Sequence, residues 1–129
     1  MVKTKSVYDP AEELDGERIL VSRYRPRGIS KERLLESAWL RSVAPSPELL
    51  RAWKAGSISW EEYVSRYHEE MSAHKKEIEE LAEKARAGTI TLLCFKREGN
   101  PCCHRHLLKR LIEKSMADTE EPLSEPKSL

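Results

Sequence analysis

The segment TITLLCF (Thr89–Phe95) is the stretch of sequence that decides the fold. Nearly all of its residues are apolar or β-branched, Gly88 precedes it, and a polar segment follows it. A short apolar run between such boundaries is typical of a strand that is buried on both faces. Strands of this kind occur in parallel sheets covered by helices, so the segment points to an α/β fold.

Two earlier segments extend this sheet. RILVSR (Arg18–Arg23) is apolar and β-branched at its centre, and TKSVY (Thr4–Tyr8) is a shorter candidate that ends at a turn-prone Asp-Pro pair. The segment AWLRSV (38–43) fits either a strand or the end of a helix. We predict a single domain with a mainly parallel sheet of about four strands flanked by helices. The strands near Ile19–Ser22 and Ile90–Phe95 should be central, parallel and neighbours or near neighbours.

Helix signals separate these strands. Ser46 followed by Pro47 is a capping hydroxyl before a proline at the first helical position, and Gly56 ends the segment. Ser30 caps a shorter helix in the same way. The final helix is predicted from Pro101 to about Met116.

The strongest helical segment runs from Ser59 to Ala87, with a capping box formed by Ser59 and Glu62. An apolar stripe along it has positions spaced alternately four and three apart: Trp60, Val64, Tyr67, Met71, His74, Ile78, Leu81 and Ala85. This spacing indicates a face that packs on the core of the chain, with His74 packed or at its rim. It also fits a coiled-coil seam, so a monomer and a homodimer both stay open.

Composition limits the classes of partner. The chain has 129 residues, of which 35% are charged, and a formal net charge of +1. Because no overall field attracts nucleic acid or anionic lipid, any anion site must be a local cluster, and a nucleic-acid partner is not expected. No apolar run approaches the length of a membrane span, and no signal peptide is visible. Residues 1–116 are expected to form the α/β domain, and residues 117–129 a polar, disordered tail.

The three cysteines all lie within Cys94–Cys103. An odd number of cysteines argues against a disulfide framework and fits a reducing, cytoplasmic location. Cys94 lies inside the predicted strand, where a cysteine is most simply a small apolar residue of the core.

The sequence NPCCHR (100–105) places unusual residues at the start of the final helix. Asn100 reads as the cap, Cys102 and Cys103 follow the proline in the first turn, and His104 and Arg105 complete it. Positive side chains are unfavourable at this end of a helix, which already carries partial positive charge. Such a conflict is relieved by a bound anion, held by free N–H groups and the arginine fork.

A second basic segment, SRYRPRG (22–28), follows the strand at Arg18–Arg23. If the two strands are parallel, both basic segments leave the same edge of the sheet, where open α/β folds bind ligands. We therefore expect Arg23, Arg27 and Arg105 to clamp a small phosphate- or carboxylate-bearing molecule. Asn100 and Cys102, at the start of the final helix, are expected to take part in the same ligand site. The alternative is that these arginines are solvated or pair with the many glutamates.

A helix start and nearby cations also lower the pKa of a thiol, which makes Cys103, and next Cys102, a candidate nucleophile with His104 beside it. The alternative is that both cysteines only pack the base of the helix. The spacing of a tyrosine-phosphatase loop is absent, and the local cysteines and histidines lack the Cys-x-x-Cys spacing of a zinc site, so no metal is expected. No cofactor is expected either, because no glycine-rich phosphate loop or dinucleotide fingerprint occurs.

Two functions remain from these residues. One is an enzyme that binds a small anion and uses Cys103 or His104. The other is a non-catalytic module that binds a nucleotide, a nucleic acid or a protein through the same basic cleft. Loss of turnover with retained binding in Cys103→Ser would distinguish them.

Several segments resemble the YeaO-like family of bacteria and archaea. They are Val7–Pro10, Ile19–Gly28, Ala44–Trp53, Ile90–Cys94 and the Cys103–Arg105 motif of one branch, and the most specific is Arg-x-x-Pro-Arg-Gly at Arg23–Gly28. The resemblance spans about Val7 to Ile112. It implies a compact α/β fold and no particular activity. The chain departs from the family where it holds Ser22 and Arg25 instead of an aspartate and a tryptophan, and Lys96 instead of an acid.

Overall fold

The computed structural model describes residues 1–34, 37–95 and 103–124, with residues 119–124 described by their backbone alone. Its sheet has four strands in the order β1-β4-β2-β3, and every neighbouring pair is parallel. The strands are β1 (Val2–Ser6), β2 (Glu17–Leu20), β3 (Ala38–Trp39) and β4 (Ile90–Cys94). The predicted α/β class with a parallel sheet is therefore confirmed.

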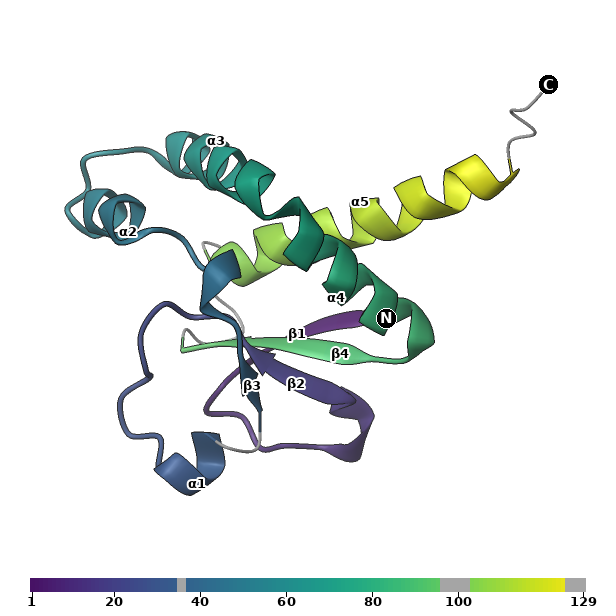
Figure 1. Cartoon of the computed structure of the whole chain (residues 1–129). Coiled ribbons are helices and arrows are strands. Elements are labelled where there is room, and N and C mark those ends of the chain that lie inside the picture. The colour runs from purple at the N-terminus through teal and green to yellow at the C-terminus, as the bar shows by residue number, and fades with distance from the viewer. Residues whose placement is uncertain (35–36, 96–102, 125–129) are drawn as a thin grey trace.

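The helices lie on both sides of this sheet. They are α1 (Lys31–Leu34), α2 (Pro47–Lys54), α3 (Trp60–Met71), α4 (Lys75–Ala87) and α5 (His104–Ser124), with short 3-10 turns η1 (Glu13–Asp15), η2 (Arg41–Val43) and η3 (Ser72–His74). Figure 1 shows α4 and α5 crossing one face of the sheet, whereas α1 lies on the opposite side. None of the helices in the described part of the chain is both long and apolar enough to span a membrane.

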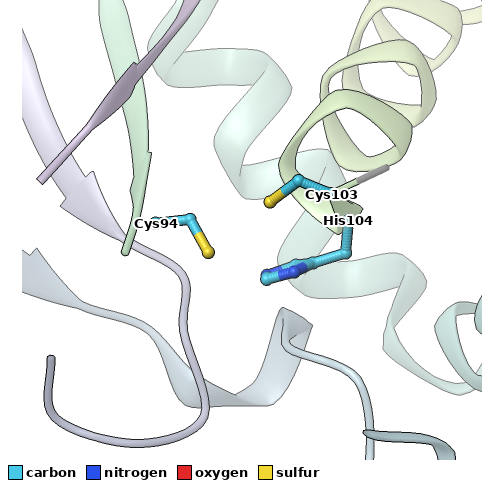
Figure 2. Close-up of side chains that lie close together, drawn as sticks. All are labelled: Cys94, Cys103 and His104. Atoms are coloured by element: carbon cyan, nitrogen blue, oxygen red, sulfur yellow. The ribbon is translucent and has the colours of Figure 1, made fainter. Parts of the chain in front are cut away.

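The alternation of side chains along β4 divides the core into two parts. Ile90 and Leu92 face the helices and join the larger cluster with Tyr67, Leu81 and Leu108. The next residue on this face is Cys94, whose side chain is directed toward α5 (Figure 2). The helical layer therefore covers the same sheet face that carries this cysteine.

The opposite face holds a smaller apolar cluster formed by Val7, Leu20, Ile29 and Leu93. Beside it lies a buried ion cluster in which the Asp15 carboxylate accepts hydrogen bonds from Lys5, at 3.1 Å, and from Arg18. Burial acts to raise the pKa of Asp15, but hydrogen bonds from the Glu12 backbone, Lys5 and Arg18 outweigh it, and the pKa lies below its ordinary value. The cluster links β1, β2 and the turn between them.

The central pairing occurs as predicted. β2 and β4 are hydrogen-bonded parallel neighbours, with Ile19 opposite Leu92 and Leu20 opposite Leu93. Because both strands end at the same edge, the segments that follow them start side by side. This relationship positions the candidate site.

The long helix predicted from Ser59 to Ala87 is wrong in one respect, because it is two helices separated by η3 at Ser72–His74. The Ser72 hydroxyl donates to the Glu69 carbonyl at 2.6 Å, which satisfies a helix end, so α3 stops there. Most of the apolar stripe is nevertheless buried in the chain's own core, including Tyr67, Met71 and Leu81. His74 lies at the rim and pairs with Glu77 at 3.7 Å.

Both ends of the final helix differ from the prediction. It begins at His104, not Pro101, so Cys103 precedes the helix instead of occupying its first turn. It continues to Ser124, beyond the predicted end near Met116. Residues 117–121 contain no glycine or proline, so nothing in this stretch stops the helix.

Candidate functional site

A cavity of about 280 Å³ lies at the carboxyl edge of the central strands. Segments distant in sequence meet there: the residues after β2, the end of β4, the start of α5, and parts of α2 and α3. Carboxyl edges of parallel sheets are common ligand sites, because the loops that leave them diverge around a crevice. It is the edge of the sheet at which β2 and β4 end.

Basic and aromatic side chains surround this cavity. Arg23, Arg25 and Arg27 come from the segment after β2, and Lys54 comes from the end of α2. No Asp or Glu occurs among the described residues that line the cavity. The aromatic lining residues are Tyr8, Tyr24, Trp53, Tyr63 and Phe95, of which Tyr8, Tyr24 and Phe95 are substantially exposed.

The three arginines of this segment are held differently. Arg23 donates from Nε to the Pro45 carbonyl at 3.0 Å and through a second nitrogen to Ala44 at 3.2 Å. Arg25 donates to the Ile29 carbonyl at 2.9 Å. The Arg27 side chain is exposed, while its backbone carbonyl accepts the Tyr8 hydroxyl at 2.7 Å. Because a guanidinium has five N–H donors, donors remain for a ligand even at Arg23 and Arg25.

Three chemically versatile side chains form the wall of the cavity nearest the sheet. Cys94 comes from the end of β4, Cys103 from the residue before α5, and His104 from the first position of α5. Figure 2 shows that they point toward one another, and one ligand atom of each lies within 4.8 Å of the other two. All three are buried, with 1%, 2% and 5% of their surfaces exposed.

The His104 ring is fixed from two sides. Its Nε2 lies 2.7 Å from the carbonyl oxygen of Val21, the residue that follows β2. The Tyr67 ring lies 5.9 Å away between centroids, and its hydroxyl donates to the Val43 carbonyl at 2.7 Å. Both contacts are buried, so they define the orientation of the imidazole.

The environment of Cys103 is opposite to the expected one. A hydrogen bond with Cys94 and burial raise the pKa of the Cys103 thiol to about 12, and the contact with His104 offsets only part of this rise. We expected the helix start and nearby cations to lower this pKa. The prediction fails because Cys103 lies outside the helix, is buried, and has a second thiol as its neighbour.

Arg105 has a structural position. Its side chain is completely buried and donates to the Lys5 carbonyl of β1 at 3.1 Å. Arg105 is not among the residues that line the cavity, whereas Arg23 and Arg27 are. Arg105 is therefore separated from Arg23 and Arg27, because the first turn of α5 directs its side chain toward β1. The other expected site residues, Asn100 and Cys102, lie outside the described residues.

Some site residues were missed from the sequence. Cys94 was interpreted only as a core residue, although alternation along the strand places it on the same face as Ile90 and Leu92. Lys54 and the aromatic residues of α2 and α3 carry no local signal for this site. They reach it only because the helices fold back over the sheet.

The family of the chain is evident from its sequence relatives. Residues 2–116 match the family DUF488-N3a, described as "Active DUF488-N3 subclade". The chain belongs to this family. The DUF488-N3a match includes every described residue that lines the cavity.

Individual relatives resemble the chain over most of its length. "Uncharacterized protein YeaO" of Escherichia coli (strain K12) is 39% identical over 92 residues, which cover 71% of this chain and 80% of the relative. "Uncharacterized protein Rv3073c" of Mycobacterium tuberculosis (strain ATCC 25618 / H37Rv) is 34% identical over 92 residues, with 70% and 78% covered. The resemblance to YeaO is thereby confirmed. No solved structure gives a significant match.

Proposed function

We propose that this protein binds a small molecule that carries a phosphate or carboxylate group, in the cavity at the carboxyl edge of the sheet. The main support is the charge of the lining, in which Arg23, Arg25, Arg27 and Lys54 occur without a described acidic residue. In a chain whose net charge is only +1, such a lining is a local excess of positive charge. A bound anion would compensate it through charge-assisted hydrogen bonds.

The aromatic residues support a second feature of the ligand. Tyr24 and Phe95 are 59% and 43% exposed, although large aromatic side chains gain free energy when they are covered. Both line the cavity, together with Trp53. A ligand with a planar or apolar part beside its anionic group would cover these rings.

Cys103 and His104 give the bound molecule reactive neighbours on the cavity wall. In an enzyme, a thiol with a raised pKa would lose its proton to an adjacent base during attack, and His104 is the nearest candidate. In a binding module, the same thiol stays protonated and only packs. Burial of Cys103 beside the Cys94 thiol favours this second function for the metal-free protein, because both features raise the pKa of Cys103.

Thermal stability tests the binding step. A ligand that binds only the folded protein raises the melting temperature by mass action. Inorganic phosphate should therefore raise the melting temperature more than sodium chloride at equal ionic strength. Arg27→Ala and Lys54→Ala should each lose most of this excess.

Arg51→Ala is the matched control, because Arg51 is also an exposed basic residue of α2 but does not line the cavity. It should keep the full effect of phosphate. An equal effect of phosphate on the wild type and all three variants would rule out the proposed site and leave only general salt stabilisation. Cys103→Ser, which should keep the effect of phosphate, then separates binding from any turnover.

A further inference from the structure

The cluster of Cys94, Cys103 and His104 has the donor atoms of a metal site. Two sulfur atoms and one imidazole nitrogen lie within 4.8 Å of one another, and all three residues are buried. Figure 2 shows the side chains converging on one point from β4 and from the start of α5. We propose that Cys94, Cys103 and His104 bind a Zn²⁺ ion whose fourth coordination position faces the cavity.

The separations suit such an ion. With Zn–S bonds of about 2.3 Å and Zn–N bonds of about 2.0 Å, the donor atoms of a tetrahedral site lie roughly 3.5–3.8 Å apart. The observed upper limit of 4.8 Å requires the donor atoms to approach by about 1.3 Å at most. Rotation about χ1 of the two cysteines is the side-chain movement that changes these separations.

The second contact of His104 supports the same assignment. Because the Val21 carbonyl only accepts hydrogen bonds, the bond of 2.7 Å requires Nε2 to carry the hydrogen. In the neutral ring, the lone pair then belongs to Nδ1. Histidines that bind metals almost always donate their other N–H to a carbonyl or carboxylate, which fixes the tautomer and the ring orientation.

Charge and softness indicate which ion fits. Two thiolates and a neutral imidazole supply two negative charges, which equal the charge of one divalent ion in magnitude. Thiolate and imidazole ligands favour zinc over magnesium or calcium, which prefer oxygen. The ion would also give the buried thiolates the positive partner that burial demands.

The remaining position gives the site its chemical character. All three residues line the cavity, so a water molecule or a ligand oxygen can complete the tetrahedron from that side. Zinc sites with three protein ligands and one exchangeable position are the catalytic kind, whereas structural sites have four protein ligands. Coordination of an anionic ligand at this position rests on the proposed function, but binding of the ion does not.

Cobalt provides a direct test. The full-length protein is stripped with a chelator and a reductant, and it is then titrated with Co²⁺ under anaerobic conditions. A thiolate-to-cobalt charge-transfer band and intense visible bands should appear and saturate at one Co²⁺ per chain. Added Zn²⁺ should displace the bound Co²⁺ and abolish these bands, because it binds such sites more tightly than Co²⁺ does.

Variants identify the ligands. Cys94→Ser and Cys103→Ser should each weaken the charge-transfer band, and His104→Ala should raise the dissociation constant for Zn²⁺ by more than about 100-fold, since even outer-shell changes cost 10–100-fold. The matched controls are Cys102→Ser and His68→Ala, which should keep the wild-type spectrum and affinity. Loss of the band in Cys102→Ser would show that the proposed set of ligands is wrong.

Native mass spectrometry of the wild type keeps the test decisive if a variant fails to fold. One zinc per folded chain is expected after exposure to excess Zn²⁺, and a metal-free folded chain would overturn the proposal. The two proposals fail separately. Arg27→Ala should lose the effect of phosphate on melting and keep the cobalt bands, whereas Cys94→Ser should weaken the bands and keep the effect of phosphate in metal-free buffer.

Discussion

The imidazole Nε2 of His104 lies 2.7 Å from the backbone oxygen of Val21, and this contact joins the first residue of α5 to the residue that follows β2. Both residues are buried, with 5% and 0% of their surfaces exposed. The contact therefore fixes the position of α5 relative to the edge of the sheet where the cavity lies. This hydrogen bond therefore affects both the stability of the fold and the orientation of the imidazole in the cavity wall.

His104→Ala should lower the free energy of unfolding by about 2–3 kcal/mol, because it leaves the buried Val21 carbonyl without its donor and removes a packed ring. Urea unfolding in a buffer with a metal chelator measures this loss apart from any bound ion. His68→Ala, at an exposed position of α3, should change the stability by less than about 0.5 kcal/mol. Equal effects of the two substitutions would show that the contact with Val21 contributes nothing.

The Cys103 thiol should react slowly with iodoacetamide at neutral pH in the metal-free folded protein. Its pKa of about 12 reduces the thiolate fraction by about three orders of magnitude relative to an ordinary cysteine. Mass spectrometry of the alkylated peptide gives the rate, and the same protein in concentrated urea is the control, where Cys103 should react as a free thiol does. A folded-state rate equal to or above the unfolded one would contradict the raised pKa.

Asp15→Asn should destabilise the protein by about 3 kcal/mol at neutral pH, because it leaves Lys5 and Arg18 without their shared carboxylate. The pKa of Asp15 is lowered in the folded state. Its contribution is therefore fully present above the unfolded value of about 3.9 and is lost as the pH falls through the lower folded value. The stability difference between the wild type and Asp15→Asn should follow that pH dependence in urea titrations.

Glu12→Gln is the control for this prediction, because the Glu12 side chain is 65% exposed and pairs with the same Lys5. An exposed ion pair contributes less than about 1 kcal/mol. If Glu12→Gln matched the loss in Asp15→Asn, burial of the Asp15 carboxylate would not be the source of the effect.

Gly16→Ala should prevent stable folding or destabilise strongly, by more than about 3 kcal/mol. Gly16 has a φ of 65°, and an added Cβ would collide with the backbone oxygen of Thr89. Gly56→Ala is a matched control, since Gly56 has a φ of 70° but nothing within 4 Å of the added Cβ. It should cost only the conformational strain of about 1–2 kcal/mol, which thermal melting resolves from the larger loss. Similar losses at both positions would contradict the collision with Thr89.

The central strands were predictable from the sequence because a strand buried on both faces consists almost entirely of apolar and β-branched residues. The runs at Ile90–Cys94 and Ile19–Leu20 hold apolar and β-branched residues, and the structure places them side by side at the centre of the sheet. The cap at Ser46 was equally clear, and its hydroxyl accepts the Leu49 N–H at 3.1 Å. Signals of this kind are local, so a single sequence contains them.

The errors in the sequence-based predictions arose where the structure depends on contacts between residues that are distant in sequence. The apolar stripe continues through Ser72–His74 without interruption, so the break between α3 and α4 is invisible in the spacing. The start of α5 was misplaced because Asn100-Pro101 looks like a cap, whereas the helix begins at His104. Proximity of Cys94 to Cys103 depends on how α5 packs on β4, which no local pattern encodes.

The strand order also governs how the chain can be built during synthesis. β1 and β2 are made first, but each of them pairs with β4, which lies between them and ends at Cys94. A ribosome-bound chain that ends before Ile90 therefore has strands without their shared partner, and their apolar residues stay uncovered until the later part emerges. Parallel pairing across this distance requires closure of long loops, which slows folding and prolongs exposure to aggregation. β2 and β3 can pair before β4 is made, but the two central pairings of the sheet form only after β4 has left the ribosome.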